Sequence, residues 1–306
     1  MNKITIKELE ETFDTKFGEF VKNEINKLDL SYYAVEQTER DMVLKQMIEV
    51  LLDPLAKRSG EHRIKDWEKG WGENRDSFRK QDTFSNLVPK YFGKYPYIRW
   101  KQKFIKGVDN ELEYNLVKVL QLWLFDMHLS NVDSIYEFGC GTGHNLLRAR
   151  DINKKAKIYG LDWTKASQET IQQINKTYDK KFIGKQFNFF QPDVSYNLDR
   201  GSGVYTFAAL EQTSDKFKSF IDYLVIQKPK ICLHIEPMWE YLDSSSLMDY
   251  LSIRYFKKRN YLNGLKKYLL ELEAQGKIEI VQDQRSYIGS MFVDGYSIIA
   301  WRVKNA

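Results

Sequence analysis

The pattern of apolar positions differs between the first hundred residues and the rest of the chain. In segments 6–28 and 39–58, apolar residues recur at i, i+3 and i+4, which predicts helices with one buried face. Segment 85–101 is aromatic and basic, and its two prolines deny it a long helix. That composition suits a segment folded over a site. Apolar residues then follow the helical spacing again from Glu111 to Leu129.

After Asn131 the pattern changes to short apolar runs that alternate with helical stretches. We expect helices between the first five runs, which implies a mostly parallel sheet covered on both faces. The last two runs are joined by segment 283–295, which is too short for a helical crossover, so these strands should pair antiparallel. The predicted strands are Ser134–Phe138, Lys157–Leu161, Gln186–Phe190, Val204–Phe207, Lys230–Ile235, Lys277–Val281 and Tyr296–Val303.

These elements predict the fold class. It is α/β, with a Rossmann-like, seven-stranded, mostly parallel sheet that ends in an antiparallel C-terminal hairpin, plus a helical N-terminal extension. We expect residues 1–110 to form that extension, as a lid and substrate region, and residues 111–306 to form the ligand-binding domain.

Composition narrows the class of protein. The 306 residues are 42% hydrophobic and 29% charged, and their mean hydropathy is −0.54. No apolar run approaches the roughly 20 residues that cross a bilayer, and the first residues lack the apolar core of a secretory signal. Two cysteines, Cys140 and Cys232, make neither a disulfide framework nor a zinc site, so we expect a cytoplasmic protein. The net charge of +5 permits an anionic substrate without requiring nucleic acid.

The first predicted strand is followed by a glycine-rich turn, "GCGTG". Gly139, Gly141 and Gly143 permit positive φ and let the backbone approach a ligand, and the next helix offers free N–H groups. The Gly-x-Gly-x-Gly spacing differs from that of dinucleotide-binding enzymes. Glu137, two positions before the first glycine, would repel a pyrophosphate but can attract a cationic amino group.

This combination resembles the first motif of class I S-adenosylmethionine-dependent methyltransferases. The resemblance covers about Glu111 to Ala306, and the antiparallel last hairpin is typical of the same family. It implies that Glu137 and the glycine loop hold the amino-acid end of S-adenosylmethionine, which methyl transfer converts to S-adenosylhomocysteine. Cys140 lies in that loop, where we expect it to fill space.

Four further positions fit the same cofactor. Asp162 ends the second strand, about 19 residues after Gly143, and an acid there accepts hydrogen bonds from ribose hydroxyls. We expect it at an exposed strand end. The resemblance implies that Trp163 faces the adenine and that Asp193, with Val194 beside it, receives the adenine amino group. The alternatives are a packed core aromatic for Trp163 and a turn-capping carboxylate for Asp193.

The acceptor should lie beyond the carboxyl ends of the strands. Methyl transfer mainly requires alignment of an oxygen or nitrogen with the methyl group, and a general base helps where that atom loses a proton. The candidate bases at the ends of the fourth and fifth strands are Glu211, His234 and Glu236, although His234 could equally be a core histidine. The candidate acceptor-binding residues are Gln212 in the same region, Tyr255 and Arg259 in a basic and aromatic segment, and Tyr97 and Arg99 in the cover segment.

Alternatives stay open for these residues and for the function. The basic and aromatic segment could be a solvated helix face, and the cover segment a plain connector. The leading function is methyl transfer to an oxygen or nitrogen of a small-molecule or sugar-type acceptor, neutral or anionic, without a metal. A weaker resemblance is to uncharacterised bacterial methyltransferases of surface-polysaccharide loci. The alternatives are a protein or nucleic-acid methyltransferase that binds its partner through the N-terminal part, and a catalytically silent scaffold.

Overall fold

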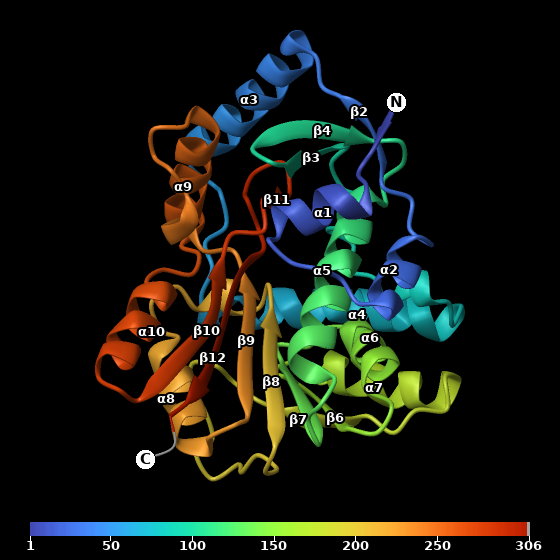
Figure 1. Ribbon diagram of the computed structural model, residues 1–306, viewed down its shortest axis with the longest axis vertical. Coiled ribbons are helices and arrows are strands. Elements are labelled where there is room, and N and C mark those ends of the chain that lie inside the picture. Colours follow the sequence, from blue (N-terminus) through green and yellow to red (C-terminus); the bar gives the residue numbers. More distant parts are fainter. Residues whose placement is uncertain (305–306) are drawn as a thin grey trace.

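Seven strands form the larger sheet of the computed structural model, which describes residues 1–304 (Figure 1). Their order is β10-β12-β9-β8-β5-β6-β7, and the five strands from β9 to β7 are parallel. β12 pairs antiparallel with both β9 and β10. The strands are β5 (Ser134–Phe138), β6 (Lys157–Asp162), β7 (Ile183–Gln186), β8 (Ser202–Phe207), β9 (Ile231–Glu236), β10 (Ile278–Gln284) and β12 (Ser297–Val303).

Helices cover both faces of this sheet because its buried strands carry apolar side chains on each side. Ile135 of β5 packs into the core under one set of helices, and its neighbours Tyr136 and Phe138 pack into the core under the other set. The first set is α5 (Leu112–Leu129), α6 (His144–Ile152) and α7 (Lys165–Thr177), and the second is α8 (Lys218–Gln227) and α10 (Leu265–Ala274). The predicted fold class is confirmed.

Two details of the predicted alternation are wrong. The third strand ends at Gln186, whereas the sequence predicted it over 186–190. Phe187 and Phe189 leave the sheet instead and pack edge-on against Phe220 of α8. Residues 187–201 then run to β8 without a helix, in turns that Asn188 and Asp193 stabilise through side-chain bonds to the backbone two residues on.

A second sheet lies above the first and has the order β1-β2-β4-β3-β11, with every pair antiparallel. The N-terminal part is therefore only partly helical. Its strands are β1 (Asn2–Lys3), β2 (Ser31–Ala34), β3 (Tyr97–Trp100) and β4 (Lys103–Gly107), and its helices are α1 (Ile6–Thr12), α2 (Glu19–Ile25), α3 (Gln37–Leu52) and α4 (Ile64–Lys80), with 3₁₀ turns η1 (Glu61–Arg63) and η2 (Phe84–Asn86).

The two sheets share a segment of chain. The connection between β10 and β12 rises to the second sheet, where β11 (Ile288–Gly289) pairs with β3 and places Ile288 opposite Trp100 and Gly289 opposite Arg99. Helix α9 (Leu247–Arg259) also climbs to this level and contacts α3. Along residues 1–304, no helix combines the length and the apolar content that crossing a bilayer requires.

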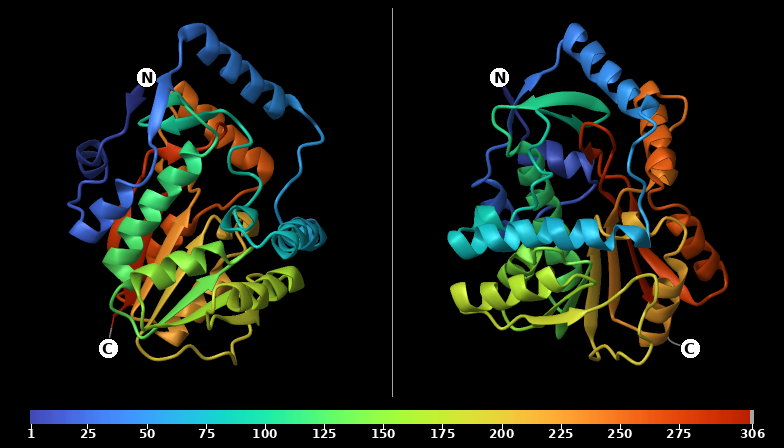
Figure 2. Two further views of the ribbon diagram at one scale, coloured as in Figure 1. Left: turned by 90° about the vertical axis from the view of Figure 1, so that its right-hand side faces the viewer. Right: turned by 180° about the vertical axis from the view of Figure 1, so that it is seen from behind.

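Helix α4 crosses the edge of the large sheet at which the parallel strands end. Figure 2 shows it running beside α7, beneath the second sheet. Its position places it over the turn that follows β5, where Trp71 contacts Gly141.

Candidate active site

The glycine-rich turn after β5 adopts the conformation that its glycines permit. Gly139, Gly141 and Gly143 have φ of +78°, +53° and +73°, in the left-handed region that side chains disfavour. The N–H groups of Gly139 and Cys140 both donate to the carbonyl oxygen of Leu161 on β6, at 2.7 and 3.0 Å. These bonds fix the turn against the neighbouring strand. Burial raises the pKa of the Cys140 thiol, so a role as reactive nucleophile is disfavoured.

A cavity that is partly open to solvent lies over this turn, and we call it the loop cavity. Its empty space, the open part included, is about 740 Å³. The turn forms its floor, and Trp67 and Trp71 of α4 form part of its cover. Its other lining residues include Thr142, His144, Asn145, Asp162, Trp163, Phe187, Phe189, Phe190, Ala208, Gln212 and Thr213.

Asp162 lines the loop cavity and also fastens the turn. Its Oδ2 accepts a hydrogen bond from the Gly141 N–H at 2.9 Å, and its Oδ1 accepts from the N–H and Oγ1 of Thr164 at 2.9 and 2.7 Å. The side chain is buried, not at an exposed strand end, and burial raises its pKa. One carboxylate therefore connects β6, the turn and the start of α7.

The aromatic wall of the loop cavity comes from the segment after β7 and from Trp163. The Trp163 ring stacks on Phe190, with ring centroids 5.8 Å apart and an interplanar angle of 26°. Asp193 and Val194 lie outside the cavity: Asp193 caps the turn at Ser195, and Val194 is exposed. The structure therefore does not bring this pair to the predicted place, because the third strand ends early and phenylalanines fill the positions behind it.

Glu137 lies beneath the turn and does not line the cavity. Its Oε1 accepts from Nδ2 of Asn145 at 2.8 Å, and the hydroxyl of Tyr205 lies near enough to the carboxyl to lower its pKa against the effect of burial. Burial raises the pKa of this carboxyl to about 8. Gly143 is also outside the lining, because it faces the side chains of Ile171 and Ile174. Asn145, which sequence reasoning missed, stands between Glu137 and the cavity.

A second cavity of about 1360 Å³, partly open to solvent, adjoins the first, and we call it the tyrosine cavity. Both cavities are lined by Trp67, Trp71, Tyr91, Ala208 and Gln212, which places the junction between them at these residues. The other lining residues include the tyrosines Tyr95, Tyr255, Tyr261 and Tyr296, and the charged residues Arg63, Lys94, Glu113, Glu211 and Arg259.

Only one of the three candidate bases, Glu211, faces this cavity. It lies in the 3₁₀ turn η3 (Leu210–Thr213), and its Oε1 accepts from Nε2 of Gln212 at 2.7 Å. Burial raises the pKa of Glu211 to about 7, although the charges of Arg259 and Arg63 oppose the shift. Glu113 of α5, which sequence reasoning missed, also faces the cavity, and burial raises its pKa to about 7.

Glu236 lies behind η3 and positions it. Its carboxyl accepts from the N–H groups of Ala209, Leu210 and Glu211 at 3.1, 3.1 and 3.3 Å. Burial raises its pKa to about 8, and the side chain does not line either cavity.

His234 is also enclosed, within β9. Its Nδ1 bonds to Oγ1 of Thr206 at 3.0 Å, its ring lies near Trp301, and burial lowers its pKa to about 3. The structure therefore places His234 as a core histidine, apart from the two cavities.

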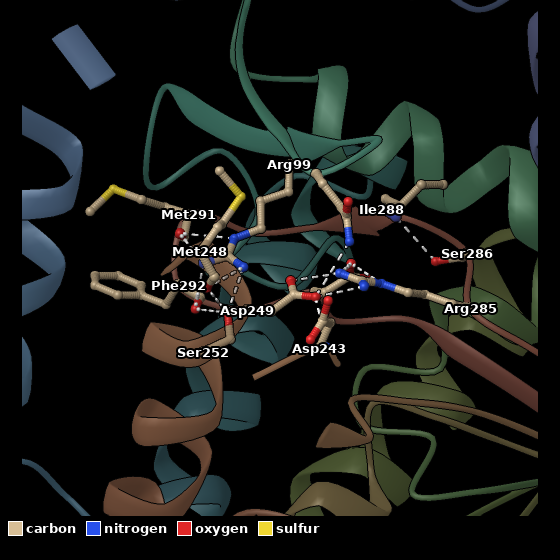
Figure 3. Close-up of polar contacts among 12 residues, drawn as sticks. Arg99, Asp243, Met248, Asp249, Ser252, Arg285, Ser286, Ile288, Met291 and Phe292 are labelled. Atoms are coloured by element: carbon tan, nitrogen blue, oxygen red, sulfur yellow. Dashed lines mark hydrogen bonds and ion pairs between the residues drawn. The ribbon is translucent and has the colours of Figure 1, made fainter. Parts of the chain in front are cut away.

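Arg99 and Tyr97 lie outside both cavities. Figure 3 shows the Arg99 guanidinium enclosed between α9 and the connection that carries Met291 and Phe292. It donates to the carbonyl oxygens of Phe292 at 3.0 Å, and of Met291 and Met248 at 3.4 Å, and burial lowers its pKa to about 10. Since Phe292 lines the tyrosine cavity, Arg99 shapes a wall without reaching a ligand. Tyr97 donates to Glu39 at 3.2 Å, away from the cavities.

The connection is held by a second buried arginine. Figure 3 also shows Arg285, which pairs with both carboxylate oxygens of Asp249 on α9 at 2.7 and 2.8 Å and donates to Asp294 at 2.7 Å. These charged hydrogen bonds fasten both ends of the connection to α9. The predicted cover segment still contributes Pro89, Tyr91, Phe92, Lys94 and Tyr95 to the cavities, and α4 covers them from the other side.

Comparisons with known proteins give matches among structures alone. No family model matches the sequence, and no curated protein sequence is significantly similar to it. A geranyl diphosphate methyltransferase solved with geranyl diphosphate and sinefungin matches with a TM-score of 0.47 and 12% identity, over 78% of this chain and 98% of its own. The magnesium protoporphyrin IX methyltransferase of Synechocystis with bound S-adenosylhomocysteine gives 0.46 and 12%, over 62% and 82%. A Podospora anserina methyltransferase, also with S-adenosylhomocysteine, gives 0.46 and 11%, over 90% and 99%.

Proposed function

We propose that this chain transfers a methyl group from S-adenosylmethionine to a small molecule. The observation that carries the proposal is the glycine turn after β5, together with the strand order of the sheet. β5 is the middle one of the five parallel strands, and antiparallel β12 lies between β9 and β10. The motif and the strand order together match the family that the sequence resembles. The loop cavity lies at the carboxyl ends of the strands, where ligands bind in sheets of this kind.

The residues around the loop cavity fit the parts of that cofactor. Asp162 presents a carboxylate for the ribose hydroxyls, and Trp163 with Phe190 offers flat apolar faces for the adenine. Asn145 lines the cavity and the Glu137 carboxyl lies behind it, so we place the cationic amino group at this end of the cavity. These assignments omit Asp193 and Val194, which lie elsewhere.

The acceptor belongs in the tyrosine cavity, and Glu211 is the base that we propose. S-adenosylmethionine supplies a methyl group on a positively charged sulfur, which needs little further activation. The chain must align the acceptor with that methyl group and remove the acceptor's proton. Glu211 faces the tyrosine cavity beside Gln212, which lines both cavities, so its carboxyl lies near their junction.

A small acceptor suits the cover over the tyrosine cavity better than a protein or nucleic-acid chain. Trp67 and Trp71 of α4 lie across the junction, Tyr91 lines it from the segment after η2, and Tyr95 lines the tyrosine cavity beside it. A macromolecule would have to displace these aromatic side chains to bring its own atom to the junction.

Calorimetry with S-adenosylhomocysteine, S-adenosylmethionine and NAD tests the proposed function. We expect binding of the first two and none of NAD. Asp162→Asn should weaken S-adenosylhomocysteine binding at least tenfold, and Asp193→Asn should leave it unchanged because that side chain lies outside the cavity. Tight binding of NAD without binding of either adenosyl compound would overturn the proposal.

A further inference from the structure

We infer that the acceptor is a flat, ring-containing hydroxy acid: its anionic group binds Arg259, and its hydroxyl group faces Glu211. This inference rests on the proposed function and names the substrate class for the tyrosine cavity. Three features of that cavity support it, namely an arginine without a counter-ion, an accessible carboxyl near the junction, and aromatic walls between them.

Arg259 is held in place but not neutralised. Its Nη1 donates to the hydroxyl of Tyr255 at 3.1 Å, and the guanidinium lies 5.7 and 5.4 Å from the ring centroids of Tyr255 and Tyr261. It makes no ion pair within residues 1–304, and its Nε has no hydrogen-bond partner there. A guanidinium that is fixed between rings and keeps free N–H groups is suited to bind a carboxylate or phosphate.

The other cations of the cavity do not substitute for Arg259. Arg63 is paired with Asp66 through its Nε at 3.1 Å. Lys94 lies over the Tyr95 ring at 5.4 Å, on a long and flexible side chain. Both add positive potential around the cavity, which favours an anion there. Arg259 is the rigid member of this group and therefore the point of recognition.

Glu211 lies close to Arg259 without pairing to it. The positive charge of Arg259 opposes the rise in the pKa of Glu211, so the two groups interact through space, yet their oxygen and nitrogen atoms are not within ion-pair distance. Each therefore keeps free hydrogen-bonding capacity toward the cavity. A ligand with an acidic group at one end and a hydroxyl at the other satisfies both.

The walls between these two groups are aromatic. The rings of Tyr255 and Phe292 stack nearly parallel, with centroids 5.0 Å apart and an interplanar angle of 15°. Tyr296 lies on the side of β12, where its hydroxyl donates to Glu113 at 3.3 Å. Aromatic rings favour stacked or edge-on contact with another ring, so the parts of these rings that remain open toward the cavity favour a flat acceptor.

Proton transfer also favours a hydroxyl on an aromatic ring. The hydroxyl loses its proton to the Glu211 carboxylate, its oxygen bonds to the methyl carbon, and the carbon–sulfur bond breaks with its electron pair left on sulfur. Glu211 then releases the proton to solvent. A phenol has a pKa of about 10, as in tyrosine, which is much closer to the value of about 7 for Glu211 than that of an alcohol or sugar hydroxyl.

The test measures binding to the protein loaded with S-adenosylhomocysteine. The probes are 6-hydroxy-2-naphthoate and 4-hydroxybenzoate, each compared with its neutral methyl ester, and 4-hydroxyphenyl phosphate, which tells a carboxylate site from a phosphate site. We expect an anionic probe to bind at least tenfold more tightly than the esters. Arg259→Gln should abolish that preference while S-adenosylhomocysteine affinity stays within twofold. Arg254→Gln, an exposed position on the same helix, is the matched control and should behave as the wild type.

Several results would overturn the inference. They are equal binding of acid and ester, binding of none of the anionic probes, an unchanged preference in Arg259→Gln, or tighter binding of glucuronate than of any aryl acid. If Arg259→Gln does not fold, the same binding comparison is made with Arg259→Lys. The comparison of acid with ester on the wild type tests the anion preference without any variant. Failure of the proposed function gives a different result. If the protein does not bind S-adenosylhomocysteine but still binds acids through Arg259, the proposed function is contradicted and the anion site is supported.

Discussion

Glu68 of α4 caps helix α7 at Ala166. Its carboxylate accepts hydrogen bonds from the N–H groups of Ala166 at 2.9 Å and of the preceding Lys165 at 2.7 Å. On the same face of α4, Arg75 and Arg79 pair with Glu169 of α7. Helix α4 is thus fastened to α7 by several polar contacts, and it carries the two tryptophans that line both cavities.

We predict that Glu68→Ala loosens this cover. Loss of a helix-capping carboxylate typically costs about 1 kcal/mol of stability, and the variant should also release S-adenosylhomocysteine faster because α4 opens more readily. Urea unfolding and stopped-flow tryptophan fluorescence measure the two effects. Glu61→Ala, an exposed residue before α4, is the control. Equal release rates in both variants would contradict a role of this contact in closure.

The contact between Gly141 and Trp71 gives a second prediction. A Cβ atom at Gly141 would lie 3.0 Å from the Trp71 ring, and φ there is +53°. Gly141→Ala should therefore lose more stability than Gly276→Ala, where φ is +73° and no atom lies within 4 Å. The control isolates the backbone strain, about 1–2 kcal/mol. In a Trp71→Ala background, Gly141→Ala should cost no more stability than Gly276→Ala does. If Gly141→Ala still costs more in that background, the Trp71 ring does not press on the turn.

The buried position of Asp162 changes what its removal should do. Asp162→Ala leaves the N–H groups of Gly141 and Thr164 without a partner, which typically costs about 1–3 kcal/mol. We therefore expect a lower free energy of unfolding as well as weaker binding of S-adenosylhomocysteine. Thermal unfolding without ligand measures the first effect, and Asp193→Ala, which removes only the contacts of an exposed turn, should lower stability by less. A stable Asp162→Ala protein would show that the turn does not depend on this carboxylate.

Sequence patterns predicted the large sheet well because its strands are buried on both faces and so read as continuous apolar runs, as in β5 and β8. The hairpin of β3 and β4 was not predicted from the sequence because its turn has an unusual composition. Lys101 and Gln102 adopt positive φ of 49° and 59°. Such turns usually carry asparagine or glycine, so the pair Lys-Gln does not predict a turn.

The residues of the candidate site also fall into those that sequence patterns could predict and those that they could not. Residues that belong to the turn and strand ends, such as Gly141 and Asp162, are local in sequence and could be found by spacing. Trp67 and Trp71 come from a helix far away in the chain, and only tertiary packing reveals that they cover the turn. Arg99 was expected at the acceptor because a lone arginine among aromatics resembles a binding group, whereas backbone carbonyls satisfy it instead.

Arg99 gives a prediction that follows from those carbonyls. Arg99→Lys cannot reproduce the forked contacts to Met291, Phe292 and Met248, so buried carbonyl oxygens lose donors at a cost of about 1–3 kcal/mol. Tyr97→Phe removes one partly exposed contact and should change stability by less than about 0.5 kcal/mol. Urea unfolding of both variants tests the contrast. Equal stabilities would mean that Arg99 does not hold the connection in place.

The last prediction concerns the pH dependence of stability. Burial raises the pKa of Glu137 to about 8 in the folded protein, well above its value in the unfolded chain. Between these two pKa values the folded state holds a proton that the unfolded state has released, so this group lowers stability as pH rises, and below the lower value its effect vanishes.

Glu137→Gln removes the titration and keeps an oxygen for Asn145. The free energy of unfolding of the variant, minus that of the wild type, should therefore increase from pH 5 to pH 8. The gain is at most about 1.4 kcal/mol for each pH unit. Urea unfolding of both proteins at pH 5, 6.5 and 8, without ligand, measures it. A difference that stays constant over this range would show that Glu137 is already ionised in the folded protein, and the amino-group contact proposed for it would then need no proton release.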